Sequence, residues 1–361
     1  MTEQLLASTF PVFKLDDSVV GTLARDILRL EIDESTDGLR TATAVFMGVA
    51  LAGSGAVEPL VHLDGSDLDF GKKLEISIGA PGNERIVFTG LISAVEVEHT
   101  EGDVPVVTAF AEDSLMKLRM TRRLKTYEQM SDADIAQNIA SQHGLSADAD
   151  ADGPTYDVVQ QWNQSDLAFL RTRAALIQAE VFANGDTLCF KSRPSRTGTS
   201  LTLVQGGELI SVRLRADLAH QRTTVKASGY DASSRDQLEE EAGSDAIQSE
   251  ASGGTTGPDL LQKALGERIS HRVRDVPLVG DEAQAFAKAE QLRRSRSFVN
   301  ADGVTNGTPD MIVGSKLTLQ RVGDAFEGAG YYVTRVLHTF DLVKGFRTHF
   351  HAERATLGGS L

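Results

Sequence analysis

Three aspartates at alternate positions are the residues whose spacing could most readily do chemistry. Asp148, Asp150 and Asp152 stand in SADADADGPTYDVV, with Gly153 directly behind them. An EF-hand calcium loop begins in this way, with carboxylates at positions 1, 3 and 5, and it ends with a bidentate glutamate at position 12. Position 12 here is Val159. Because the main ligand is missing, we interpret the stretch as an acidic surface connection.

The other candidate reactive residues match no complete motif. His338, His349 and His351 could be metal ligands, but the sequence pairs no carboxylate with them. The stretch from Ser114 to Lys117 matches the S-x-x-K of penicillin-recognising enzymes, whose companion motifs are missing. No phosphate-binding loop, dinucleotide fingerprint, G-x-S-x-G or H-E-x-x-H occurs. The sequence therefore predicts no enzyme, with no catalytic, cofactor-binding or metal-ligating residue and no cofactor.

The single cysteine is expected to be structural. Cys189 stands at an alternating position of a strand pattern, as a packed core thiol does. One cysteine cannot form an internal disulfide, so the fold depends on packing.

Charge and length limit the class of protein. The chain has 361 residues, which suggests two or three domains, and 41% of them are hydrophobic. Its net charge of −15 disfavours nucleic acid and anionic membranes as partners. The exception is the basic run KLRMTRRLK from Lys117 to Lys125, which is expected to meet an acidic patch on another protein or on a neighbouring copy.

No signal for export or membrane insertion is apparent. The start, MTEQLLASTFPVFKL, lacks the basic segment and apolar core of a standard signal peptide. No stretch approaches the roughly 18 apolar residues of a membrane helix. We therefore expect synthesis in a bacterial cytoplasm and no membrane insertion.

The chain divides into three predicted parts. Residues 1–117 alternate apolar and polar side chains, which predicts an antiparallel β domain, a barrel or a sandwich. Residues 118–195 predict an inserted α/β domain. Residues 196–361 return to the strand pattern and form a second β domain. Two interruptions are predicted there: a flexible acidic loop at 235–257, with six acidic residues and one basic, and helices at 258–298.

Local signals in the inserted domain are specific. Ser131 and Asp134 have the spacing of a capping box, and Gly144 is placed to end that helix. A second capped helix begins at about Asp166. It leads into a hairpin in which Asn184-Gly185 predicts a type I′ turn.

Two β segments share a pattern, which predicts a duplicated β domain. The matching residues are Gly71, Lys73, Leu74 and Ile76 against Gly314, Lys316, Leu317 and Leu319, followed by Ile92, Ser93 and Val95 against Val333, Thr334 and Val336.

Three stretches together resemble the phage late control protein D family. They are SDADIAQNIASQHGLSAD, QWNQSDLAFLRTRAALIQAEVFANGDTLCF and GSKLTLQRVGDAFEGAGYYVTRVLHTFDLVKGFRTHFHAER. That family comprises baseplate hubs of contractile tails, similar to the first part of the valine-glycine repeat spikes of type VI secretion. The resemblance implies an α+β, mainly β fold: two similar antiparallel β-barrel tube domains with an inserted small α/β domain.

The resemblance also implies partners. A homotrimer would carry six similar β domains, which matches a six-fold inner tube to a three-fold spike. The chain stops soon after Arg354, so the spike is expected to be a separate polypeptide. Other baseplate proteins complete the expected partners, within a phage virion or a contractile injection particle, and no contact with nucleic acid is needed.

Two alternatives remain open at this point. A tail-tip peptidoglycan hydrolase would need paired carboxylates or a metal. A carbohydrate-binding β module would need exposed aromatic side chains, whereas the chain has one tryptophan and 6% aromatics.

Overall fold

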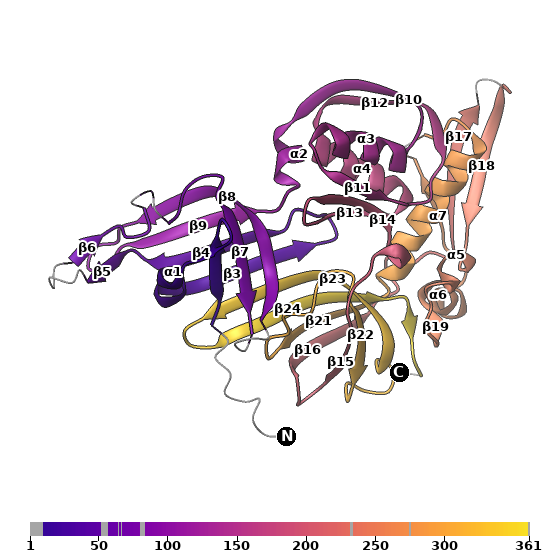
Figure 1. Ribbon diagram of the computed structural model, residues 1–361. Helices are drawn as coiled ribbons and strands as arrows, with labels where there is room; N and C mark the ends of the chain where they lie inside the picture. Colours follow the sequence, from indigo (N-terminus) through magenta and orange to yellow (C-terminus); the bar gives the residue numbers. More distant parts are fainter. Residues whose placement is uncertain are drawn as a thin grey trace.

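The computed structural model describes residues 10–51, 57–63, 65, 67–79, 84–231, 234–273 and 276–359. Figure 1 shows three parts: a first β unit on the left, a second β unit below, and an α/β unit above them. No helix in the described ranges is long and apolar enough to cross a membrane.

The first β unit comprises the elements from β1 to β9. They are β1 (Val12–Leu15), β2 (Ser18–Val19), α1 (Gly21–Asp26), β3 (Ile27–Ser35), β4 (Thr41–Met47), β5 (Val49–Leu51), β6 (Val57–Pro59), β7 (Lys73–Ile78), β8 (Arg85–Glu98) and β9 (Val106–Glu112).

The second β unit takes its strands from two stretches of chain. They are β15 (Ser200–Val204), β16 (Leu209–Ala216), β21 (Val299–Thr305), β22 (Lys316–Gln320), β23 (Gly328–Asp341) and β24 (Gly345–Arg354). Both β units belong to one 13-stranded sheet with the path β16-β21-β24-β23-β3-β4-β9-β8-β7-β1-β2, to which β22 and β15 attach beside β23. The mainly β class is therefore confirmed. The path is open, so the closure of two barrels stays a prediction.

The two β units have the same backbone geometry where the sequence repeats. The amide of Gly71 donates to the carbonyl of Ile92 at 2.8 Å, and the amide of Gly314 donates to the carbonyl of Val333 at 2.9 Å. Both glycines have positive φ, which glycine adopts without strain. These two pairs are the ones that the sequence pattern matches.

Bulges also fall at matching positions. The β8–β9 register shifts between Ile92 and Ala94, and the β23–β24 register shifts between Val333 and Arg335. One sequence pattern thus specifies one strand geometry twice.

The correspondence extends to the strands beyond each bulge. Ala111 of β9 pairs with Ala42 of β4, and Ala352 of β24 pairs with Ala301 of β21. All four alanines are buried. The next strand is β3 in the first unit and β16 in the second, so β3 and β16 are counterparts. The units differ at their far ends, because β1 runs antiparallel to β7 whereas β15 runs parallel to β22.

The inserted unit has the predicted helices. Its elements are α2 (Met116–Met120), β10 (Arg122–Ser131), α3 (Asp132–Gln142), β11 (Ser146–Ala149), β12 (Thr155–Ser165), α4 (Asp166–Ile177), β13 (Ala179–Asn184), β14 (Thr187–Ser192) and η2 (Arg193–Ser195). Ser131 and Asp134 form the predicted capping box. Ser165 caps α4, on which Leu167, Leu170 and Ala174 are buried.

The predicted hairpin turn is wrong by one residue. Asn184 pairs with Thr187, so the two-residue turn is Gly185–Asp186. Of these two, Gly185 alone has positive φ. A type I′ turn needs positive φ at both positions, whereas a type II′ turn needs it only at the first.

The prediction of a flexible loop at 235–257 is also wrong. This segment forms β18 (Asp236–Ala242), α5 (Asp245–Gln248) and β19 (Thr255–Thr256). β18 pairs with β17 (Thr224–Asp231), whose other neighbour is β20 (Ile269–Arg272). The acidic composition did not predict this strand. The glutamates of β18 are half-buried or exposed, whereas Ala242 at its end is buried. Lys226 binds Glu239 at 2.8 Å.

The helices predicted at 258–298 are present. They are α6 (Gly257–Leu265) and α7 (Gly280–Arg296), and the chain ends in β25 (Thr356–Leu357) after β24. Ala227, Ala242, Phe286 and Ala287 share one hydrophobic cluster with the inserted unit. The chain thus returns to the inserted unit after leaving it, and α7 lies beside that unit in Figure 1.

Candidate functional site

The first β unit and the inserted unit are joined by a buried arginine. Arg196 binds Glu34 of β3 at 2.8 Å and Glu180 of β13 at 3.1 Å. All three side chains are less than 10% exposed. Arg40 holds the second oxygen of Glu34 at 2.7 Å. Because a buried charge is costly unless it is paired, these contacts fix the position of each unit.

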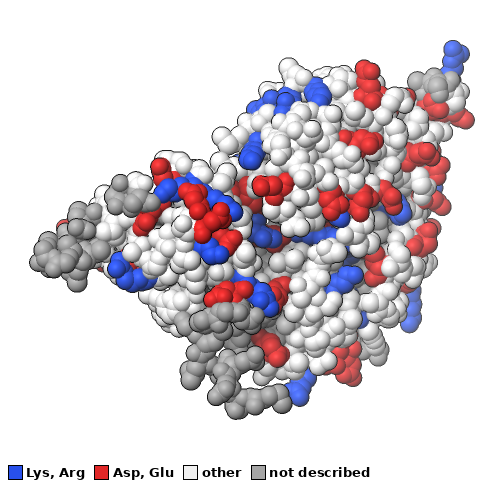
Figure 2. Space-filling model, viewed as in Figure 1, with Lys and Arg blue, Asp and Glu red and all other residues white. Residues whose placement is uncertain are grey.

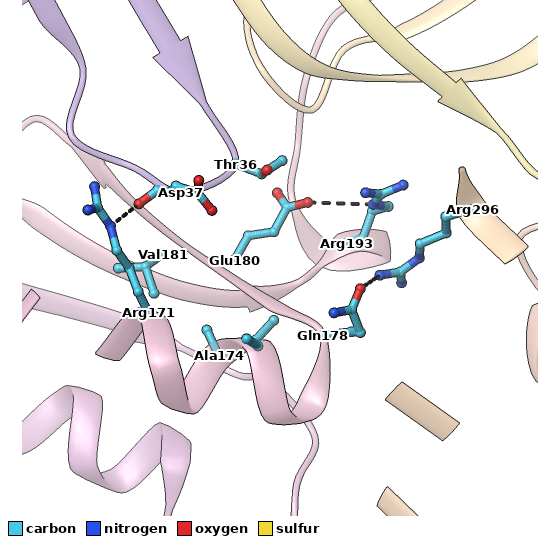
Figure 3. A pocket seen from close by; sticks show the side chains of 11 residues that line it. Thr36, Asp37, Arg171, Ala174, Gln178, Glu180, Val181, Arg193 and Arg296 are labelled. Carbon is cyan, nitrogen blue, oxygen red and sulfur yellow. Dashed lines mark hydrogen bonds and ion pairs between the residues drawn. The ribbon is translucent and has the colours of Figure 1, made fainter. Parts of the chain in front are cut away.

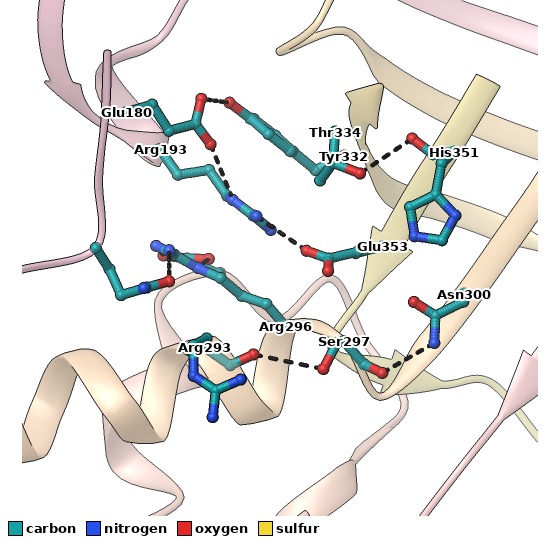
Figure 4. A network of polar contacts seen from close by, with 12 residues as sticks. Glu180, Arg193, Arg293, Arg296, Ser297, Asn300, Tyr332, Thr334, His351 and Glu353 are labelled. Atoms are coloured by element: carbon teal, nitrogen blue, oxygen red, sulfur yellow. Dashed lines mark hydrogen bonds and ion pairs between the residues drawn. The ribbon is translucent and has the colours of Figure 1, made fainter. Parts of the chain in front are cut away.

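The same glutamate reaches the second β unit. The Tyr332 hydroxyl of β23 donates to Glu180 at 2.8 Å. Arg193 binds Glu353 of β24 at 2.9 Å and stacks over the Tyr332 ring. Figure 4 shows Glu180, Tyr332, Arg193 and Glu353 linked in this way. The network therefore joins all three parts of the chain.

Burial and the local charges keep Tyr332 and Arg193 protonated. Burial and then Glu180 raise the pKa of the Tyr332 phenol, so Tyr332 remains a donor. Burial opposes the charge of Arg193, but Glu353 and Glu180 outweigh it and raise the pKa of the guanidinium. Neither change favours proton transfer near neutral pH.

A pocket beside the network is lined by the turn after β3 and by α4. Figure 3 shows Arg171 pointing toward Asp37 at one end and Arg296 meeting Gln178 at the other. Arg171 donates to the backbone carbonyls of Asp37 and Gly38. The pocket is thus bordered by groups that already bind one another.

Glycine is required in that turn. Gly38 has φ of +68°, and a Cβ there would lie 2.2 Å from the carbonyl oxygen of Val181. The first β unit and the inserted unit approach each other too closely at this point for any side chain.

A second arginine anchors the acidic segment. Arg296, at the end of α7, binds both carboxylate oxygens of Glu250 at 2.6 and 2.8 Å. Burial opposes the charge of Glu250, but the hydrogen bond and the charge of Arg296, with smaller contributions from Arg193 and Lys288, together outweigh it and lower the pKa of that carboxyl. Bidentate pairing of this kind is directional, so it orders the segment that composition alone predicted to be flexible.

The predicted candidate residues do not come together. His338 lies in the core, with Nδ1 near Thr348 Oγ1 and Nε2 near the Met311 carbonyl, whereas Nδ1 of the partly exposed His351 contacts Asp302. No group of three His, Cys, Asp or Glu in the described ranges is placed to hold a metal ion.

Two of the three alternating aspartates, Asp148 and Asp150, have structural partners. Asp148 lies in β11, which pairs in parallel with β14, so the expected connection contains a strand. Lys191 binds Asp148 at 2.8 Å and approaches Asp150 at 3.8 Å. Cys189 is buried as predicted, and burial raises the pKa of its thiol. Ser114 donates to the Gly185 carbonyl at 2.8 Å.

Much of the basic run is engaged inside the chain. Arg119 binds Glu112 at 2.7 Å, Arg123 binds the buried Asp166 at 2.9 Å, and Lys125 donates to Asn138. Figure 2 shows acidic side chains spread over this face, with basic ones in small separate groups. The expected contact of this run with a partner stays a prediction.

The charged residues of the junction were not predicted from the sequence. Glu34 lies on the same inward-facing side of β3 as Leu30 and Ile32, where the alternation of the strand predicts an apolar residue. A charged residue at a strand position where the alternation predicts an apolar one is the signal that could have identified Glu34. Nothing in the sequence shows that Arg196 is its partner.

The fold is that of phage tail proteins. A 43 kDa tail protein of prophage MuSo2 from Shewanella oneidensis has a TM-score of 0.70 at 12% identity, over 96% of this chain and 99% of that one. A tail protein from Neisseria meningitidis has a TM-score of 0.66 at 12% identity, with 96% of each chain covered. The predicted resemblance to tail hubs is confirmed at the level of the fold. Membership in the late control protein D family stays a prediction.

A secretion protein shares the fold as well. An Escherichia coli component of the type VI secretion system, described as similar to bacteriophage T4 tail proteins gp27 and gp5, has a TM-score of 0.55. It is 12% identical over 93% of this chain and 74% of that chain. No curated protein matches the sequence significantly.

One family model covers most of the sequence. It is described as the Alg8 N-terminal domain, and it matches residues 25–341, which include the inserted unit and most of both β units. The chain therefore belongs to the Alg8 N-terminal domain family.

Proposed function

We propose that this protein is a structural baseplate hub of a contractile tail or contractile injection particle, where three copies connect a six-fold inner tube to a three-fold spike. The observation that carries the proposal is the pair of equivalent β units fused edge to edge through β23 and β3. Three such chains present six equivalent units in one ring while keeping true three-fold symmetry.

The junction network supports this role. A symmetry adapter must hold its two β units at a fixed angle, and the Glu34–Arg196–Glu180 bridge with Tyr332 and Arg193 opposes relative movement. A rigid chain presents its two units to the tube in the same way in every copy. The inserted unit then lies beside the two β units, where it can contact other baseplate proteins.

A hydrolase is the second candidate, and the carboxylates argue against it. Arg196 brings the carboxylates of Glu34 and Glu180 close together in the protein interior. A glycosidase needs its pair open to a sugar ring, with one carboxyl able to act as an acid. Both of these groups are buried, and each is held by a guanidinium.

A carbohydrate-binding module has one observation in its favour. Trp162, the single tryptophan, is 71% exposed beside its cross-strand neighbour Leu124. A stacking platform usually uses several aromatic rings, and no second ring is paired with Trp162 across β10 and β12. We therefore favour a protein contact at this surface.

Co-expression with the neighbouring tube and spike genes tests the hub proposal. We expect a complex that contains three hub chains and one spike trimer, measured by native mass spectrometry and imaged by electron microscopy as a three-fold ring. A hub that stays monomeric and binds neither partner would overturn the proposal. Turnover of purified peptidoglycan would instead favour the hydrolase.

A further inference from the structure

The junction between the two β units shows how one unit joins the next. The second half of β23 pairs antiparallel with β3, from Arg335 opposite Ser35 to Asp341 opposite Arg29. This junction lies within one chain. It can therefore serve as a template for a junction between chains.

The counterparts of these two strands have open edges. β8 is the counterpart of β23, and β16 is the counterpart of β3. Across the described residues, β8 pairs beyond Ile92 with β9 alone. Within the same described residues, β16 pairs with β21 and otherwise makes one bridge, between Leu209 and Gln205. In the described part of the fold, each chain thus has one open edge at β8 and one at β16.

Burial indicates that β16 lacks a neighbour. Leu30 and Ile32 of β3 are each 1% exposed beside β23. Their counterparts on β16, Val212 and Leu214, are only half-buried although they also face the core. A strand laid along β16 would cover them, because it would supply the contacts that β23 supplies to β3.

The same difference appears on β8. Val336 and His338 of β23 are buried beside β3. Their counterparts Val95 and Val97 are half-buried, although both pack against the first core. Both open edges are therefore incompletely buried at the positions that the template covers.

The template also fixes the register. Leu337 lies opposite Asp33 in the β23–β3 pair. Transfer to the counterpart strands puts Glu96 of β8 opposite Arg215 of β16. Both side chains are exposed on the outer face, where the guanidinium of Arg215 also binds Asp217 of its own chain.

A second charge pair follows two residues further along. Thr339 lies opposite Glu31 in the template, and the counterparts are Glu98 and Arg213. Opposite charges that face each other across antiparallel strands stabilise the pairing, and like charges destabilise it. Two complementary pairs in one transferred register are a specific signal.

The charges also select the correct edge. In the template, Arg335 of β23 binds Asp33 of β3 at 2.6 Å, so β3 carries the negative charge. β8 carries glutamates and would face like charges on β3. It can pair favourably only with the arginines of β16, which prevents a wrong assembly.

We propose that β8 of one copy pairs antiparallel with β16 of the next copy, with Glu96 opposite Arg215 and Glu98 opposite Arg213. The occupant of each open edge is a second copy of this chain. The contact is head-to-tail, so three copies close a ring in which junctions within and between chains alternate. This inference rests on the proposed function, since it supplies the trimer interface of the hub.

Charge exchange tests the contact. Variant one carries Glu96→Arg and Glu98→Arg, and variant two carries Arg213→Glu and Arg215→Glu. We expect each alone to lose the trimer by native mass spectrometry, and a chain with all four changes to regain it. The control, Glu128→Arg with Glu240→Arg, makes the same charge change on β10 and β18 and should leave the trimer intact.

A cross-link provides a second measurement that does not depend on affinity. With Glu96→Cys and Arg215→Cys in one chain, a short bifunctional thiol reagent should give covalent trimers on a denaturing gel. The native thiol of Cys189 is buried, so it should not interfere. Trimers that survive both reversals and give no cross-link would overturn this interface while leaving the hub intact. A wild-type chain that never trimerises, even with its spike, would overturn the hub proposal as well.

Discussion

Arg196 and Glu34 form a buried ion pair at 2.8 Å, between a residue that follows the inserted unit and a residue in a strand of the first β unit. The partners are 162 residues apart in sequence. Arg196 also binds Glu180, so a single guanidinium satisfies two buried carboxylates. The position of the inserted unit against the sheet depends on this residue.

Arg196→Met should strongly destabilise the protein. The substitution removes the charge and leaves Glu34 and Glu180 buried with fewer partners, which costs about 3–5 kcal/mol in the free energy of unfolding. Urea unfolding followed by circular dichroism measures this change.

The matched control is Lys73→Met, which breaks the exposed pair with Asp17. An exposed pair contributes less than about 1 kcal/mol. Equal effects of the two variants would contradict a structural role for the buried network.

Gly38→Ala should loosen the same junction by steric means. The added Cβ would collide with the Val181 carbonyl, and φ is positive there. We expect a loss of more than about 2 kcal/mol in unfolding free energy, because a clash is added to the backbone strain.

Gly102→Ala is the control, since its φ is +85° with nothing near the new Cβ. Strain alone should cost about 1 kcal/mol there. If thermal unfolding shows the same loss for both variants, the close approach at Gly38 is not what constrains the turn.

His338 should make stability depend on pH. Burial, together with the charge of Arg40, lowers the pKa of this imidazole to about 4, below its ordinary value of 6.5. The unfolded chain therefore binds a proton more readily, and the stabilisation present above pH 6.5 is lost as the pH falls toward 4. The difference corresponds to about 3 kcal/mol at 1.36 kcal/mol per pKa unit.

His338→Gln isolates this effect. Asp113 titrates in the opposite sense, because burial raises the pKa of its carboxyl to about 6 and its contribution is lost as the pH rises. Subtracting the variant from the wild type removes the Asp113 contribution from the comparison. The stability advantage of the wild type should shrink between pH 7 and pH 4, and an advantage that is constant with pH would show that His338 does not titrate in this range.

Local signals in the sequence were sufficient to predict several structural elements. The Ser131–Asp134 capping box predicted the start of α3 because both hydrogen bonds form between residues three apart. The repeat predicted a duplicated β domain, and Gly71 and Gly314 share a positive φ, which suits glycine.

Features that depend on distant residues could not be predicted. The β18 strand is stabilised by pairing with β17 and by Lys226, neither of which composition reveals. The β23–β3 junction joins residues about 300 positions apart, and no local pattern specifies that register. The network around Glu180 could not be predicted either, because its members are distant from one another in the sequence.

The mass of the native complex is the decisive measurement for a trimeric hub. The hub should be measured alone and after co-expression with its neighbouring spike and tube proteins. We expect a hub trimer, or three hub chains bound to three spike chains. A monomer under both conditions would contradict it.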